Sequence, residues 1–110
     1  MEDATRDNFD ELVAEGLTLV DVWGPDCTQC KKLMPDVEKI EEEKGDQLKV
    51  IKLNAPKARR LLMKMKLTGL PAFLMFKDGE EVSRHDGKVT ANSLREWVDE
   101  TLSELTADKS

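Results

Sequence analysis

The feature that most constrains the fold is a seven-residue apolar run, LTLVDVW, which spans Leu17–Trp23. Its length and β-branched residues are typical of a strand, and its scarcity of polar positions indicates that both faces of the strand are covered. Segments with apolar residues at helical spacing flank it at Asp7–Glu15, which Gly16 ends, and at Cys27–Lys44, which Gly45 ends. The sequence therefore predicts a buried strand between helices.

The remaining elements follow in the order that an α/β fold requires. Strands are predicted at Gln47–Leu53, Pro71–Phe76 and Glu80–His85, and the turn sequence KDG joins the last two into a hairpin. Helices are predicted from Pro56, through the apolar stripe of Ala58, Leu61, Leu62 and Met65, and from an N-cap at Thr90 to about Leu105. Because strands joined through helices pair in parallel, we expect an α/β three-layer sandwich with a mixed four- or five-stranded sheet. We expect residues 1–110 to form a single domain.

The balance of charge argues against nucleic acid or an anionic membrane as a partner. The chain has 23 acidic and 17 basic residues and a net charge of -6, which repels both. It has no run of about 18 apolar residues that would span a bilayer. Its acidic start, MEDATRDNFDEL, lacks the basic and then apolar order of a secretory signal, so we expect a cytoplasmic protein.

Both cysteines lie in the segment WGPDCTQCK, two residues apart. Two are too few for a disulfide scaffold. A structural zinc site needs about four ligands, and the chain offers only Cys27, Cys30 and His85, so a second copy would have to complete the set. An inert buried pair is the other alternative.

The position of the pair favours a dithiol redox site. A Gly-Pro turn precedes it, and a helix is predicted to begin there, which brings the two sulfurs within bonding distance. The helix dipole would stabilise a thiolate at Cys27, which would attack a substrate disulfide. Cys30, deeper in the first turn, would resolve the mixed disulfide.

Two segments resemble the thioredoxin family: VDVWGPDCTQCKKLMP is similar to its active-site segment and LTGLPAFLMFKDGE to its cis-proline segment. The likeness runs from Phe9 through VIKLN and Gly87 into the last helix. It implies a thioredoxin fold and an electron carrier that reduces disulfide-containing proteins. It also implies a monomer with no bound cofactor or metal, re-reduced by a thioredoxin reductase or a similar donor.

The resemblance also implies a role for each matching residue. Cys27 would be the nucleophile, Cys30 the resolving thiol and Asp21 the buried carboxylate beneath them. Lys52 would be the neighbour of Asp21, and Trp23 would be a surface ring beside the site. Pro35 would kink the helix, and Pro71 would be the cis-proline. Leu70 and Gly87 would belong to the substrate-binding surface.

The residues themselves support these roles unequally. Asp21 lies inside the most apolar strand, so burial is expected to raise its pKa and let it exchange a proton with Cys30 through a water; the alternative is an exposed aspartate at the strand end. Without the resemblance, Lys52 would be read as solvated. Sequence alone also predicts a trans bond before Pro71, because only about 5 to 6% of X-Pro bonds are cis.

Three departures from the family pattern stand out. Thr28 and Gln29 replace the usual Gly-Pro between the cysteines, and we expect them to change the redox potential. Asp26 replaces a tryptophan: its charge would raise the pKa of the Cys27 thiol, or it would form a capping box with Gln29. The opening strand is missing or reduced to Met1–Ala4, which would leave the strand at 47–53 at the sheet edge.

Two further features bear on partners. The stretches KKLMPDVEKI and KLNAPKARRLLMKMKLTGLP resemble the clostridial thioredoxins associated with glycine reductase. The alternatives to a general reductase are a dedicated electron donor to one enzyme, a glutaredoxin-like protein and a non-catalytic binding subunit. The helix at 57–66 carries a basic cluster, which is either a solvated face or a docking site for an acidic partner. His85 is interpreted as an ordinary surface residue. The cluster consists of Lys57, Arg59, Arg60, Lys64 and Lys66.

Overall fold

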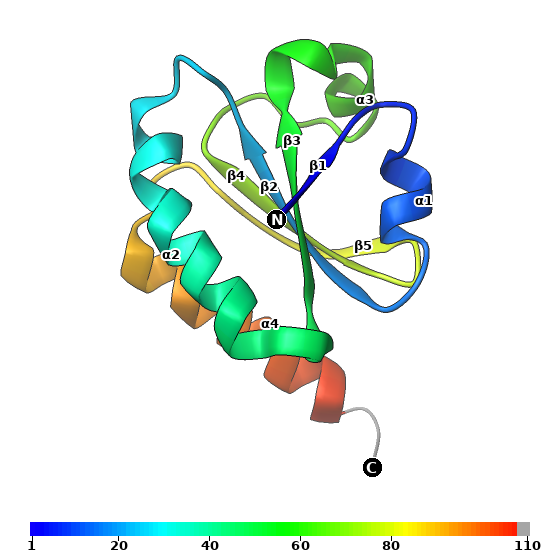
Figure 1. Cartoon of the computed structure of the whole chain (residues 1–110), viewed down its shortest axis with the longest axis vertical. Helices are drawn as coiled ribbons and strands as arrows, with labels where there is room; N and C mark the ends of the chain where they lie inside the picture. Colours follow the sequence, from blue (N-terminus) through cyan, green and yellow to red (C-terminus); the bar gives the residue numbers. More distant parts are fainter. Residues whose placement is uncertain (108–110) are drawn as a thin grey trace.

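The computed structural model describes residues 1–107 and shows a mixed five-stranded sheet between two layers of helices (Figure 1). The strands are β1 (Glu2–Ala4), β2 (Leu17–Trp23), β3 (Lys49–Asn54), β4 (Ala72–Lys77) and β5 (Glu80–Asp86). The helices are α1 (Phe9–Val13), α2 (Thr28–Lys44), α3 (Arg59–Lys64) and α4 (Ala91–Ala107), with 3-10 turns η1 (Gly45–Gln47) and η2 (Ala55–Lys57).

The sheet order is β1-β3-β2-β4-β5, with β2 at its centre. β2 pairs in parallel with β3, which α2 connects to it, and antiparallel with β4. β4 and β5 form the antiparallel hairpin that the KDG turn predicted, and β5 is the edge of the sheet. The predicted α/β sandwich with a mixed sheet is confirmed.

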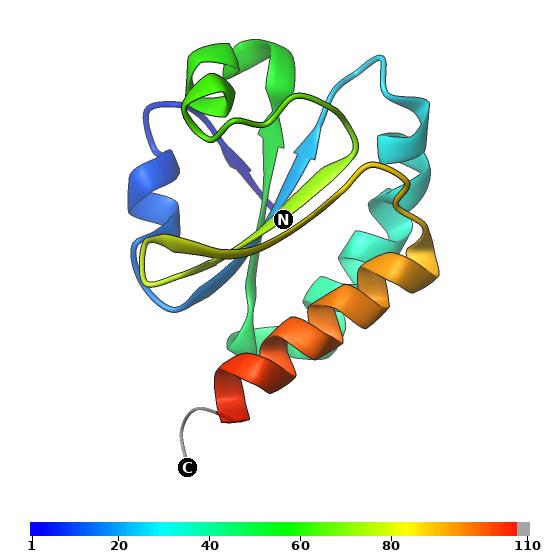
Figure 2. The same ribbon diagram turned by 180° about the vertical axis from the view of Figure 1, so that it is seen from behind.

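Two apolar cores fill the space between the layers, one on each face of the sheet. α1 and α3 cover one face, with Val20 and Val22 of β2 in their core. α2 and α4 lie side by side over the other face, with Leu19 of β2 in theirs (Figure 2). Alternate residues of β2 thus enter different cores, which explains why its sequence is apolar at nearly every position.

The opening strand corrects one sequence-based expectation. Glu2–Ala4 pairs in parallel with Ile51–Leu53, so β3 lies inside the sheet and the expectation that it forms the edge is wrong. Only Ala4 of this three-residue strand is buried. A strand this short shows no alternation, and its pairing with residues almost fifty positions away defines it.

The helices begin and end close to the predicted positions, with one exception. Gly45, at a φ of 53°, ends α2, and Pro35 lies inside that helix. The helix expected from Pro56 is divided: Pro56 lies in η2, and Ala58, at a φ of -134°, separates it from α3. The predicted N-cap at Thr90 is confirmed, since its Oγ1 accepts a hydrogen bond of 3.0 Å from the amide of Ser93.

Candidate redox site

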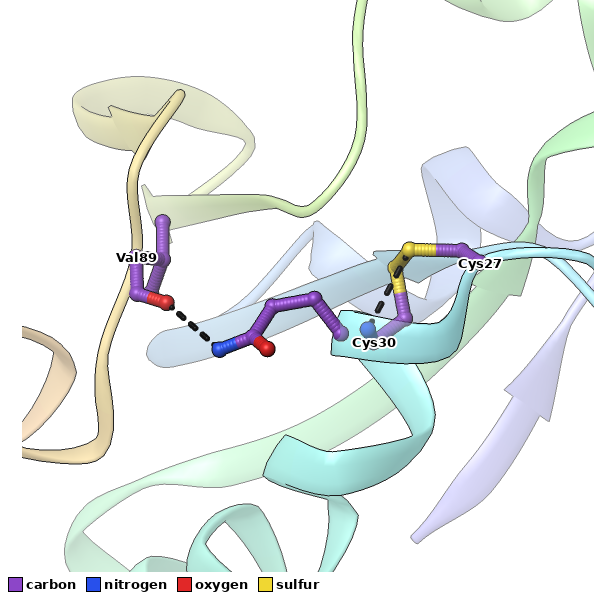
Figure 3. The surroundings of a disulfide bond; sticks show 4 residues. Cys27, Cys30 and Val89 are labelled. Carbon is purple, nitrogen blue, oxygen red and sulfur yellow. Dashed lines mark hydrogen bonds between the residues drawn. A yellow bond between two sulfur atoms is a disulfide. The ribbon is translucent and has the colours of Figure 1, made fainter.

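The two cysteines form a disulfide at the first turn of α2 (Figure 3). The chain leaves β2 at Trp23, turns through Gly24 to Asp26, and enters α2 with Cys27 as its N-cap. The amide of Cys27 donates to the carbonyl of Gly24 at 3.0 Å, and the amide of Cys30 donates to Sγ of Cys27 at 3.2 Å. The helix amide that meets Sγ here is the type of donor that stabilises a thiolate after reduction.

The two cysteines differ in their exposure to solvent. Cys27 is partly exposed, whereas Cys30 is only 1% exposed and continues the buried stripe of α2 through Leu33 and Val37. Solvent therefore reaches the Cys27 end of the disulfide far more than the Cys30 end. Cys30 is more buried than Cys27, as its deeper position in the first turn predicted.

Asp21 lies in the middle of the sheet and is only 1% exposed, so the alternative of an exposed strand-end aspartate is wrong. It follows Leu19 by two residues and so faces the layer of α2 and α4, as does the Cys30 stripe. Within residues 1–107, neither carboxylate oxygen accepts a hydrogen bond. Burial raises the pKa of Asp21 from 3.8 to about 7, and the positive charge of Lys52 opposes part of that rise.

Lys52 occupies the position on β3 directly opposite Asp21 on β2. Its Nζ lies 3.6 Å from Oδ1 of Asp3 in β1 and 5.8 Å from the centroid of the Trp23 ring. The side chain is 29% exposed, so it is neither fully solvated nor fully buried. Lys52 therefore links the buried carboxylate, the first strand and the tryptophan beside the site. The Trp23 ring is half-buried.

The residues that depart from the family pattern take different positions. The capping-box alternative for Asp26 is wrong, because Cys27 is the N-cap and Asp26 is exposed in the turn before it. Thr28 is exposed as the first residue of α2. Gln29 reaches across to the β5–α4 loop, where its Nε2 donates to the carbonyl of Val89 at 3.0 Å (Figure 3).

The loop before β4 brings Leu70 and Pro71 to the same end of the sheet. The Leu70–Pro71 bond is cis, as the resemblance implied. A Cβ built on Gly24 would lie 3.2 Å from Cδ1 of Leu70, so glycine allows this loop to approach the turn before Cys27. Leu70 and Gly87 line one small pocket, which places Gly87 beside the loop as well.

Sequence reasoning missed two contacts beside the site. The Gln29–Val89 hydrogen bond joins positions 60 residues apart, and no local pattern signals it. His85, interpreted from sequence as an ordinary surface residue, is partly exposed but also stacks on Trp97 and lies 2.9 Å from Oγ of Ser93, contacts that were not predicted. His85 lies in β5 and Trp97 in α4, so no local pattern in the sequence signals their contact.

The described residues hold neither a metal site nor a membrane span. No group of three or more histidine, cysteine, aspartate or glutamate side chains in residues 1–107 is arranged to hold a metal ion. No helix in that part of the chain is long and apolar enough to cross a membrane.

Comparison with known proteins assigns the chain to a family. The family model for thioredoxin matches residues 1–100. The chain is 40% identical over 84 residues to a thioredoxin of Acetoanaerobium sticklandii, covering 74% of this chain and 80% of that protein. It is 33% identical over 99 residues to the thioredoxin of Bacillus subtilis, covering 90% of this chain and 95% of the relative. With a Cys27–Cys30 disulfide at the start of α2, the chain is a thiol-disulfide oxidoreductase and belongs to the thioredoxin family.

Proposed function

We propose that Cys27 is the attacking thiol and Cys30 the resolving thiol of a cytoplasmic, monomeric protein-disulfide reductase formed by a single domain, residues 1–110. The difference in access carries this proposal: Cys27 is partly exposed and Cys30 is 1% exposed. A thiolate must reach its target sulfur to react. The partly exposed cysteine therefore reacts with the substrate first, and the buried one reacts only within the protein.

The reaction is an exchange of two electrons. The Cys27 thiolate attacks one sulfur of the target disulfide, and the target's other sulfur leaves as a thiolate. Cys30 then loses its proton and attacks Sγ of Cys27, which releases the second target thiolate. The target gains two electrons, and the protein ends with the Cys27–Cys30 disulfide present in the structure. A separate reductase must return the two electrons.

Asp21 is proposed as the acceptor of the Cys30 proton. Its pKa of about 7 supports this, because a carboxyl group that changes charge near neutral pH can both take up and release a proton. Lys52 acts on this group through its charge, and its Nζ also lies 3.6 Å from Oδ1 of Asp3. Both are positioning or proton-transfer residues that do not contact the substrate.

The substrate-binding surface is proposed to consist of Trp23, Leu70, Pro71 and Gly87. The contact between Leu70 and the Gly24 turn supports this placement, as does the pocket that Leu70 shares with Gly87. Thr28, Gln29 and Asp26 are proposed to tune the redox potential. The hydrogen bond from Gln29 to Val89 supports a role in fixing the first turn of α2.

A dedicated electron donor to one partner enzyme is a second candidate, because basic residues are concentrated on one part of the chain. Reduction of insulin with dithiothreitol as the electron source separates the two. A general reductase accelerates insulin reduction well above the dithiothreitol background. A dedicated donor shows no such acceleration and serves its own partner only.

The proposed roles predict the behaviour of a Cys27→Ser variant in the same assay. We expect its rate of insulin reduction to fall to the dithiothreitol background, because the remaining thiol of Cys30 is buried. Circular dichroism of the variant checks that the fold is retained. Turnover by Cys27→Ser above that background would overturn the assignment of Cys27.

A further inference from the structure

Charge is distributed unevenly along this chain. Residues 47–77 contain eight of the 17 basic residues and none of the 23 acidic ones. This segment supplies β3, η2, α3 and β4 and the loop that ends at Pro71. A protein with a net charge of -6 therefore contains a segment of 31 residues that carries positive charge alone, and this segment includes Lys52 and Leu70 of the candidate redox site.

The positive charge is concentrated on η2, α3 and the residues after them. We call this set the α3 basic surface; it consists of Lys57, Arg59, Arg60, Lys64 and Lys66. All five side chains are exposed, and within residues 1–107 none forms a salt bridge. By contrast, Lys44, Arg84 and Arg95 each pair with a carboxylate. The α3 basic surface is free to meet negative charge from another molecule.

An apolar groove of about 400 Å³ lies against this surface. Its lining includes Pro56, Arg59, Met63, Leu67 and Leu70. Met63 is 75% exposed, the largest exposed fraction among the bulky apolar side chains of the described residues. The groove therefore offers an apolar surface with a guanidinium group among its lining residues.

The groove adjoins the turn that leads into the disulfide. A Cβ on Gly24 would lie 3.2 Å from Leu70 and 3.7 Å from Pro56, two of the groove residues. The amide of Cys27 donates to the carbonyl of Gly24. Figures 1 and 2 show α3 and the β2–α2 turn at the same end of the sheet. An extended segment whose cysteine reacts with Cys27 can therefore continue into the groove.

We propose that this groove and the α3 basic surface select acidic protein substrates. The preferred partner carries, beside the attacked cysteine, an apolar side chain that enters the groove and Asp or Glu residues that meet Arg59 and its neighbours. Complementary charge of this kind raises association rates and excludes partners of the wrong sign. The inference rests on the proposed disulfide reductase function, to which it adds the class of substrate.

The preference for acidic substrates can be tested, because the net charge of the protein by itself would favour basic substrates. If only the total charge of -6 mattered, a basic substrate would be favoured. Three synthetic peptides serve as substrates: they share one disulfide and one leucine, and their flanking residues are Glu, Gln or Lys. Their reduction rates by the dithiothreitol-reduced protein are compared in single turnovers at low salt and at high salt.

We expect the Glu peptide to react fastest at low salt, about fivefold faster than the Gln peptide, as for a single close charge pair in water. The difference should shrink at high salt, because exposed charges are screened. Arg59→Glu should remove the preference for the Glu peptide, and Met63→Ser should slow all three peptides. Lys39→Glu, the same change of charge on an exposed residue of α2, should leave the preference intact.

A binding measurement separates failure of this inference from failure of the proposed function. A cysteine-free Glu peptide should shift the NMR amide signals of residues 55–70, whether or not the protein reduces disulfides. Reduction of all three peptides at equal rates, or loss of the preference in Lys39→Glu, would overturn the inference alone. Absence of reduction with every peptide would overturn the proposed function, while the amide shifts would still decide the inference.

Discussion

Asp21 experiences two opposing effects on its ionisation. Burial in the sheet favours the neutral carboxyl, and the positive charge of Lys52 favours the carboxylate. Burial is the larger effect, so the pKa rises to about 7. Its position inside an apolar strand made the direction of this change predictable from sequence. The size depends on the neighbours that the fold supplies.

The raised pKa of Asp21 predicts that Asp21→Asn changes how stability depends on pH. The folded protein binds this proton more tightly than the unfolded chain, where the pKa is 3.8, so stability falls as pH rises from about 4 to about 7. The variant lacks this loss. The free energy of unfolding of Asp21→Asn minus that of the wild type should therefore rise by up to roughly 4 kcal/mol between pH 4 and pH 8.

Urea unfolding of both oxidised proteins across this pH range measures that difference. Asp26→Asn, the same substitution at an exposed carboxyl, is the control and should give no comparable gain. A difference between Asp21→Asn and the wild type that stays constant with pH would show that Asp21 is not a buried titrating group.

At the scale of helices and strands, the elements that could be predicted were those with a clear pattern of apolar residues in the sequence. The bounds of β2 were predicted correctly, because burial on both faces leaves a continuous signal in the sequence. A reduced opening strand within Met1–Ala4 was one of the alternatives, but its pairing with β3 was not predicted. The division between η2 and α3 was not predicted either, because both features depend on contacts or backbone angles that a few residues do not encode. The contact of Gln29 with Val89 belongs to the same class.

The start of α4 carries a local signal and a testable contribution to stability. Thr90 and Ser93 cap each other: the amide of Ser93 donates to Oγ1 of Thr90, and the amide of Thr90 donates to Oγ of Ser93 at 2.9 Å. Thr90→Ala should lower the free energy of unfolding by about 1 kcal/mol. Thr106→Ala, in the last turn of α4, is the control, and an equal loss in both variants would contradict the capping role.

At the scale of the whole molecule, the fold brings chemistry and charge to one end of the sheet. The disulfide, the loop ending at Pro71 and the α3 basic surface all lie there, although they come from separate parts of the sequence. The site cysteines were predictable from their spacing and position. The groove was not, because its lining residues converge only in the folded chain.

The order of the two thiols is tested most directly by trapping the mixed disulfide. The reduced Cys30→Ser variant is mixed with a disulfide peptide, and its intact mass is measured. We predict a stable adduct of one peptide chain on Cys27, because the serine hydroxyl that replaces the resolving thiol cannot release it, and no adduct in the Cys27→Ser variant. An adduct on Cys30 in Cys27→Ser, with none on Cys27 in Cys30→Ser, would contradict the assignment.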